Sequence, residues 1–235
     1  MFSPQRPRRD AVPDHVAVHT WPARHPLADL LFVHGARPRS ARFERLAHAL
    51  TARRINVSGV QPRGRGPVTL HGLAEALGVL SDRARLPLIL GGYSLGGTAA
   101  ALAACADDNR LAGLLLVATP ITARPLEPGG LDLGDLDAGR RRAQSERVAP
   151  RTPRSAWDLL ADRFPVLGLP VMFVHGMGDT IVPARENHAW AARLKHADFI
   201  GFHGARHDVL NAPGHRRVAT TIADFVLAAA LDAAA

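Results

Sequence analysis

Disulfides and lysine-rich surfaces are both excluded by the composition of this chain. Its 235 residues include one cysteine, Cys105, so no intramolecular disulfide can form. Cys105 lies in the small-residue run TAAALAACA, where a buried thiol packs like an alanine, and we expect a structural role for it. Of the 29 basic residues only Lys195 is a lysine, and the other 28 are arginines. The arginines are scattered and no recognition motif accompanies them, so the net charge of +8 does not indicate a nucleic-acid-binding protein.

Long apolar runs are also missing. No stretch approaches the ~18 apolar residues that a membrane span requires, so we expect no stable membrane insertion. The start, MFSPQRPRRDAVPD, is rich in proline and arginine and lacks the apolar core of roughly 7–15 residues found in secretory signals. We therefore expect a cytoplasmic protein with a flexible N-terminal arm over residues 1–13 and a single domain over residues 14–235.

What the sequence does contain is an alternation of short apolar runs with longer segments of helical period. This pattern is typical of a mostly parallel sheet flanked by helices, and it predicts a three-layer α/β/α sandwich. The expected strands are 15–21 at an edge, 28–35, 54–60, 86–92, 111–119, 169–176 and 197–202. The expected helices begin at Ser40 and after Ser94, and cover about 69–84, 155–163, 184–195 and 214–230.

The segment of about 121–154 differs from the rest of the chain. It holds four prolines and seven arginines, together with several glycines and aspartates. We expect it to form a short cap insertion over the sheet and not a second domain.

Gly92-Tyr93-Ser94-Leu95-Gly96 fits the pattern G-x-S-x-G between an expected buried strand and an expected helix. In that setting the serine occupies a sharp, strained turn, and the glycines avoid clashes with neighbouring chain. The turn raises the hydroxyl above the sheet, and the following helix N-terminus favours developing negative charge. Ser94 is therefore the candidate nucleophile. The five residues alone would also fit a glycine turn with a solvent-facing serine.

A serine nucleophile needs a base and an acid that orients the base. Asp179 directly follows the expected strand 169–176, at the sheet edge where open α/β sheets carry out chemistry. His207 lies in the loop between the last expected strand and the last expected helix. The order serine, aspartate, histidine matches that of α/β-hydrolase triads, and it predicts Ser94, Asp179 and His207 as the catalytic residues. The alternative for Asp179 is a turn former beside Gly178.

Other histidines carry less weight. His203 stands four residues before His207, and such a pair can bind metal, but the sequence has no H-E-x-x-H motif. We expect no metal site and no cofactor. His34 and His175 each end an expected strand as a His-Gly pair, which we interpret as hydrogen-bonded histidines at turns.

Acyl transfer also needs two main-chain N–H donors that meet the negative charge on the carbonyl oxygen. One is expected from Leu95, the residue after the nucleophile, and the other from Ala36, in the loop after strand 28–35.

With these motifs the chain resembles the small serine hydrolases of the monoacylglycerol lipase and lysophospholipase-like group, within the α/β-hydrolase superfamily. The matching segments follow the family's order: VHGAR (33–37), PRGRG (62–66), GGYSLGG (91–97), HGMGDTIVP (175–183) and GARHDVLN (204–211). The resemblance implies Ser94 as nucleophile, Asp179 as acid and His207 as base. It also implies Ala36 and Leu95 as the backbone oxyanion donors.

Two features depart from that family. Gln61-Pro62 stand where the family often has an aspartate before its R-G-x-G loop, and the cap is short, with few apolar residues to line an acyl site. The cap arginines either attract an anionic substrate or form a solvated surface. We therefore expect the substrate to be a carboxylic ester or thioester of a small to medium acyl group, cleaved through a Ser94 acyl-enzyme.

Two other functions would keep these residues. A cofactor-free cyclase, lyase or acyltransferase of a biosynthetic pathway would use the same triad and exclude water. A non-catalytic binding protein would have the fold without turnover, since a fold does not fix a function. The intact triad argues against the binding protein, and the sequence does not indicate an oligomeric state.

Overall fold

The computed structural model describes residues 16–33, 40–62, 70–107, 110–122 and 154–234. Their seven strands form one sheet in the order β1-β3-β2-β4-β5-β6-β7. β1 lies at one edge and runs antiparallel to β3, and every other neighbouring pair is parallel. The strands are β1 (Val16–Trp21), β2 (Ala28–Val33), β3 (Ile55–Pro62), β4 (Leu88–Tyr93), β5 (Leu111–Val117), β6 (Val171–Gly176) and β7 (Ala197–Phe202).

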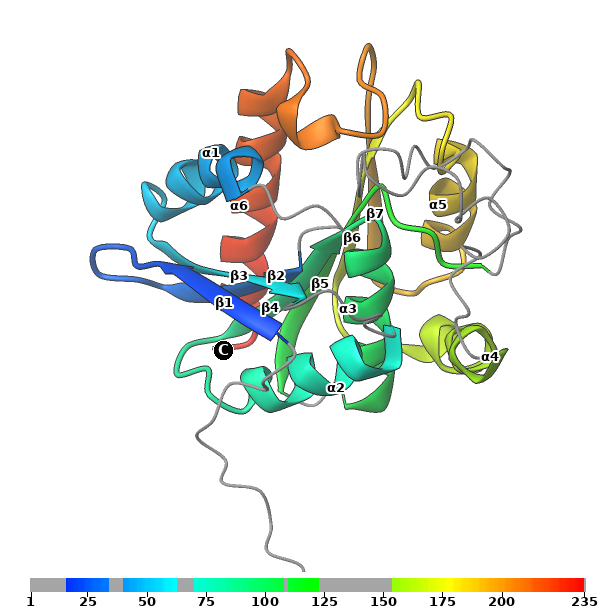
Figure 1. The fold of residues 1–235 in the computed structure, drawn as a ribbon, viewed down its shortest axis with the longest axis horizontal. Helices are drawn as coiled ribbons and strands as arrows, with labels where there is room; N and C mark the ends of the chain where they lie inside the picture. Colours follow the sequence, from blue (N-terminus) through cyan, green and yellow to red (C-terminus); the bar gives the residue numbers. More distant parts are fainter. Residues whose placement is uncertain (1–15, 34–39, 63–69, 108–109, 123–153, 235) are drawn as a thin grey trace, which may run out of the picture.

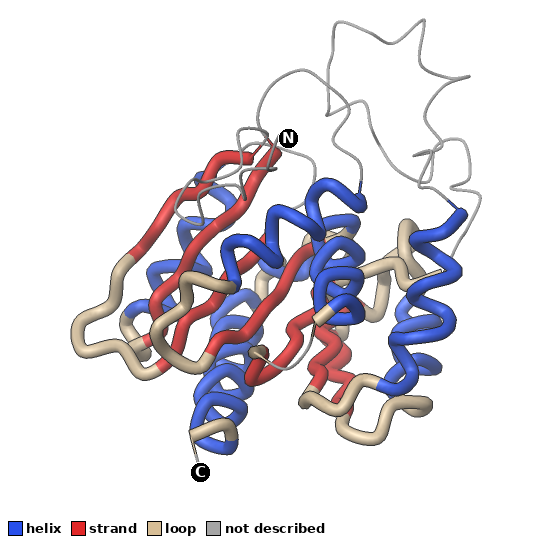
Figure 2. The backbone as a smooth tube through the Cα atoms, turned by 90° about the horizontal axis from the view of Figure 1, so that it is seen from below, coloured by secondary structure: helices blue, strands red, loops and turns tan. Residues whose placement is uncertain are grey.

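Helices cover both faces of this sheet. They are α1 (Ser40–Thr51), α2 (Leu70–Ser81), α3 (Leu95–Ala106), α4 (Arg154–Arg163), α5 (Ala184–Ala191) and α6 (His215–Asp232), with short 3-10 helices η2 (Phe164–Val166) and η3 (Val209–Asn211). α1 and α6 pack on one face, and α2, α3, α4 and α5 pack on the other (Figure 1). Figure 2 shows the helices on either side of the strands from a second direction. The predicted three-layer α/β/α sandwich is confirmed.

The central strands are apolar on both sides because successive side chains of a strand point to opposite faces. In β5, Leu114 and Leu116 join the apolar core under α2, α3, α4 and α5. Leu115 and Val117 join the second core, under α1 and α6. A parallel sheet covered by helices on both faces requires such continuous apolar runs, which is why these runs predicted the strands.

Several element boundaries differ from the predicted ones by a few residues, and two of them have a clear structural cause. β3 continues through Gln61 and Pro62, which we expected in a loop, because both pair with residues of the edge strand β1. A proline at the end of a strand leaves the rest of the ladder intact. Helix α5 ends at Ala191, earlier than expected, because the amides of Arg193 and Leu194 bond to carbonyls only three residues before them. Such tighter bonds are common where an α-helix ends.

Some expectations fall outside the described residues: the N-terminal arm 1–13, the loop with His34 and Ala36, and all but the ends of the cap 121–154. Of the helices in the described ranges, none combines the length and the apolar character needed to cross a bilayer.

Candidate active site

Ser94 occupies the turn between β4 and α3, in a conformation that L-amino acids rarely adopt. Its φ is 55° and its ψ is −130°. Such a conformation costs on the order of 1–3 kcal/mol and persists only where neighbouring structure enforces it. The Ser94 amide donates to the carbonyl of Val117 in β5 at 2.9 Å, and the Ser94 carbonyl accepts from the amide of Gly97 at 2.9 Å. The turn is therefore held from the sheet on one side and from the helix on the other.

Three glycines around Ser94 allow neighbouring chain to approach closely. A Cβ atom at Gly92 would overlap the backbone of Gly96. A Cβ at Gly96 would overlap the carbonyl oxygen of Val33 in β2, and one at Gly97 would overlap the side chain of Thr119. We expected a steric role for the glycines two positions before and after the serine. A side chain is equally excluded at Gly97, which we did not expect, because the side chain of Thr119 lies against this position.

His207 connects the serine to the acid. Its Nε2 lies 3.2 Å from Ser94 Oγ, and its Nδ1 lies 2.8 Å from Asp179 Oδ2. Because a carboxylate only accepts hydrogen bonds, Nδ1 carries the proton and Nε2 presents its lone pair to the serine hydroxyl. The ring of Tyr93 packs at 5.1 Å from the imidazole, centroid to centroid. This arrangement prepares Nε2 to accept the hydroxyl proton.

Asp179 lies in the loop after β6, and its side chain is completely buried. Its Oδ1 accepts hydrogen bonds from the amides of Ile181 at 2.8 Å and Val182 at 3.0 Å. Its Oδ2 faces two histidines, His207 Nδ1 at 2.8 Å and His175 Nε2 at 3.1 Å. Both carboxylate oxygens are thus hydrogen-bonded although no water reaches them.

These contacts decide the charge of Asp179. Burial alone would raise the pKa of its carboxyl, but hydrogen bonds from His175 and His207, the positive charge of His207 when that ring is protonated, and the Val182 amide outweigh burial. The pKa of Asp179 is therefore held well below its usual range. An ionised carboxylate beside Nδ1 can stabilise the positive charge that His207 gains when it accepts a proton.

The structure thus brings together Ser94, Asp179 and His207, and Leu95 follows as the first residue of α3. His203 is exposed on the surface. His175, which we interpreted as a histidine at a turn, contacts the predicted acid directly. Its place four residues before Asp179 was the sequence signal that could have indicated this contact.

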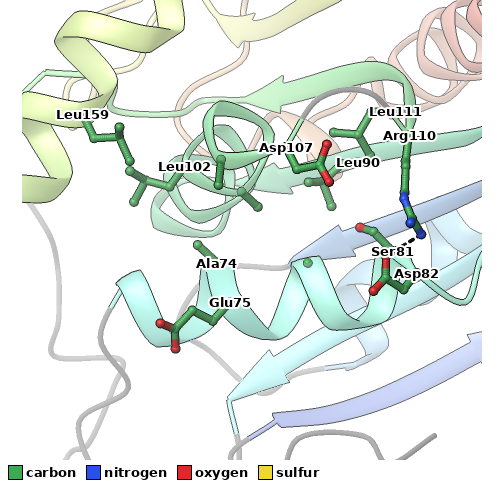
Figure 3. A pocket seen from close by; sticks show the side chains of 13 residues that line it. Ala74, Glu75, Ser81, Asp82, Leu90, Leu102, Asp107, Arg110, Leu111 and Leu159 are labelled. Atoms are coloured by element: carbon green, nitrogen blue, oxygen red, sulfur yellow. Dashed lines mark hydrogen bonds and ion pairs between the residues drawn. The ribbon is translucent and has the colours of Figure 1, made fainter. Parts of the chain in front are cut away.

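A pocket lies elsewhere, between α2 and the C-terminal half of α3. It is lined by residues such as Ala74 and Glu75 of α2, Leu102 of α3 and Leu159 of α4 (Figure 3). Ser94 stands at the opposite, N-terminal end of α3, so this pocket does not contain the candidate active site. Across the described ranges, no three His, Cys, Asp or Glu side chains gather in a way that would hold a metal ion.

The sequence matches no protein-family model, and a search of curated proteins finds no match. Solved structures do resemble it. The monoacylglycerol lipase of Paleococcus ferrophilus aligns with a TM-score of 0.72 and 17% identity, over 91% of this chain and 99% of the lipase. Est1E from Butyrivibrio proteoclasticus aligns with a TM-score of 0.71 and 18% identity, over 91% of this chain and 94% of Est1E.

A third structure is described as an α/β-hydrolase enzyme, MGS-MChE2, from the metagenome of sediments of the Mar Chica lagoon in Morocco. It aligns with a TM-score of 0.66 and 14% identity, over 89% of this chain and 94% of its own. At such identities the similarity concerns the fold. This chain has the α/β-hydrolase fold.

Proposed function

We propose that this chain, which has the α/β-hydrolase fold, is a serine hydrolase that cleaves carboxylic esters or thioesters through a Ser94 acyl-enzyme. The observation that carries the proposal is the continuous hydrogen-bonded chain from Ser94 Oγ through His207 to a buried, ionised Asp179. This series of hydrogen bonds begins at Ser94, on a strained strand-to-helix turn, which is the position from which serine nucleophiles of this fold act. The names of two similar structures, the monoacylglycerol lipase and a thermophilic esterase from Thermogutta terrifontis, support ester chemistry.

In the first half of the reaction, Ser94 Oγ attacks the carbonyl carbon of the substrate while His207 Nε2 takes the hydroxyl proton. The negative charge collects on the carbonyl oxygen, and the protonated imidazole is stabilised by Asp179 through Nδ1–H. The tetrahedral intermediate then collapses, and the bond to the leaving alcohol or thiol breaks. His207 Nε2 donates its proton to that leaving group, and the acyl group stays on Ser94.

In the second half, water replaces the leaving group. His207 Nε2 takes a proton from the water as its oxygen attacks the acyl carbon, and it returns that proton to Ser94 Oγ as the acyl–enzyme bond breaks. The products are a carboxylic acid and the free enzyme.

Two main-chain amides complete the proposed machinery. The Leu95 amide, directly after the nucleophile, and the Ala36 amide are the proposed donors to the carbonyl oxygen. The N-terminus of α3 adds favourable electrostatics at the same place, because the first amides of a helix carry partial positive charge. Donors of this kind typically contribute about 2.7–4 kcal/mol of barrier lowering each.

The proposed substrate carries a small to medium acyl group. This part of the proposal rests on the composition of the cap, whose few leucines would line a modest acyl site.

A fluorophosphonate probe tests the proposal without knowledge of the natural substrate. It should label the wild-type protein at Ser94, and the protein should hydrolyse p-nitrophenyl acetate and butyrate. Ser94→Ala should lose both labelling and hydrolysis. Wild-type protein that stays unlabelled would rule out a serine hydrolase. Labelling at Ser94 without turnover of any ester or thioester would favour the cyclase, lyase or acyltransferase function instead.

A further inference from the structure

Among the described residues, His175 is a second histidine that contacts the proposed acid, at the same carboxylate oxygen as the base. Its Nε2 lies 3.1 Å from Asp179 Oδ2 and 2.8 Å from the carbonyl oxygen of Val182. Carboxylate and carbonyl oxygens only accept hydrogen bonds, so Nε2 must carry a proton and donate to both. His175 is completely buried, and its Nδ1 has no hydrogen-bond partner in the described structure. The ring is therefore oriented by what Nε2 binds.

The oxygen that His175 holds is the one that orients the base. Oδ1 of Asp179 is fixed by two main-chain amides, while Oδ2 faces only the two histidines among the described residues. Without His175, Oδ2 would be held by His207 alone, the group whose position it has to determine. Because His175 is a second donor to Oδ2, it fixes the plane of the carboxylate independently of His207.

The surrounding chain leaves His175 little freedom. Along β6, His175 points to the same face as Phe173, into the layer of α3, α4 and α5. Its ring lies beside that of Phe199 in β7, with 6.4 Å between the centroids. At the next residue, Gly176, a Cβ atom would overlap carbonyl oxygens of the loop that carries His207. The strand end with His175 is thus packed directly against the loop with the base.

We infer that His175 is a positioning residue of the proposed triad, which holds Asp179 Oδ2 toward His207 through its Nε2–H. The inference deepens the proposed function and rests on it for its effect on catalysis. The geometry itself can be tested separately.

Two carboxamide substitutions at residue 175 form a matched pair. The amide nitrogen of His175→Gln reaches about as far along the side chain as Nε2, so it can still donate to Asp179. The amide nitrogen of His175→Asn reaches only as far as Nδ1, which has no partner, and the donor to Asp179 is lost. Both variants lose the ring and bury one carboxamide. Thermal unfolding of each variant measures what the substitution costs the fold.

The readout is the second-order rate constant for fluorophosphonate labelling of Ser94. The glutamine variant should keep most of the wild-type rate. The asparagine variant should lose on the order of tenfold to a hundredfold, the effect expected when a catalytic group is misplaced by about 1 Å. Equal rates in the two variants, whether both normal or both low, would overturn the inference, because the donor at the Nε2 position would then not matter.

A spectroscopic measurement keeps the test independent of activity. A histidine N–H that donates to a buried carboxylate gives a separate low-field proton resonance, and here both His207 Nδ1–H and His175 Nε2–H donate to Asp179. The readout is the His207 Nδ1–H resonance, which is identified as the one that His207→Gln removes. This resonance should persist in wild type and in His175→Gln, and it should broaden or disappear in His175→Asn. If it is unchanged in the asparagine variant, His175 does not position Asp179. If wild type shows it but is never labelled, the proposed function fails while the positioning role still stands.

Discussion

The α-carbon of Gly96, in the first turn of α3, lies against the main-chain carbonyl oxygen of Val33 at the end of β2. β2 is an inner strand, hydrogen-bonded to β3 and β4, and α3 is packed between the sheet and α2. Neither backbone can therefore move away to admit a side chain. This contact sets how closely the helix after Ser94 approaches the sheet.

Gly96→Ala should consequently destabilise the protein by about 1–3 kcal/mol, the usual cost of forcing an extra group into packed structure. It should also lower the rate of Ser94 labelling, because α3 must shift. Urea unfolding measures the first effect. The matched control is Gly78→Ala on α2, where a Cβ meets nothing within 4 Å. That change should stabilise the protein by roughly 0.5–1 kcal/mol, as alanine does in a helix interior. Equal stabilities of the two variants would contradict the steric role of Gly96.

The backbone of Ser94 is strained because its φ is positive, and removal of the Cβ atom should relieve that strain. Ser94→Gly and Ser94→Ala both lose the hydroxyl and its bond to His207, but glycine adopts positive φ without steric cost. We expect Ser94→Gly to be more stable than Ser94→Ala by about 1 kcal/mol in urea unfolding. If the two variants have the same free energy of unfolding, the backbone of the turn relaxes once the hydroxyl is removed, and the Cβ atom causes no strain.

Asp179→Asn should preserve the fold near the site and remove most of the activity. An amide group facing Nδ1 favours the wrong tautomer of His207, because its nitrogen donates where the carboxylate accepted. In a comparable triad such a change lowers kcat by about 10⁴. The drop should appear in hydrolysis of p-nitrophenyl acetate and in fluorophosphonate labelling alike. A loss below about tenfold would argue against Asp179 as the acid.

The lowered pKa of Asp179 also makes stability depend on pH. A carboxyl with a depressed folded-state pKa contributes stability above its unfolded value, about 3.9, and this contribution is lost as pH falls further toward the folded value. Urea unfolding of wild type from about pH 7 to about pH 3 should therefore lose stability below about pH 4 more steeply than Asp179→Asn does. Gly78→Ala removes no titratable group and should follow the wild-type pH dependence. If the free energy of unfolding changed with pH in the same way in wild type and in Asp179→Asn, ionisation of Asp179 would not contribute to the stability of the fold.

Local patterns were enough to predict the turn at Ser94 and most of the sheet. The apolar strand, the glycines and the small-residue helix around Ser94 are consecutive in the sequence, so their steric logic can be seen without the fold. Asp179 and His207 were predicted from their order and from the strands before them, and the structure places His207 beside Ser94 and Asp179 beside His207.

Contacts between distant segments could not be predicted in this way. Pro62 belongs to β3 only because it pairs with Val16, and an isolated proline beside glycines indicates a loop. The contact of His175 with Asp179 depends on a tight turn, in which the Asp179 amide bonds to the Gly176 carbonyl at 3.1 Å. That turn brings the carboxylate back over the strand end. The spacing of four residues between His175 and Asp179 allows this contact but does not by itself predict the turn.

The hydrogen bond between Ser94 and His207 spans 113 residues of chain. The elbow is held by β4, α3 and the neighbouring strands β2 and β5, whereas its partners come from the loops after β6 and β7, on the far side of the sheet. A chain that has been synthesised only as far as β5 thus contains the nucleophile but lacks the acid and the base. Under the proposed function, reactivity at Ser94 requires the C-terminal third of the chain, and labelling of Ser94 therefore reports that this third has packed onto the rest of the sheet.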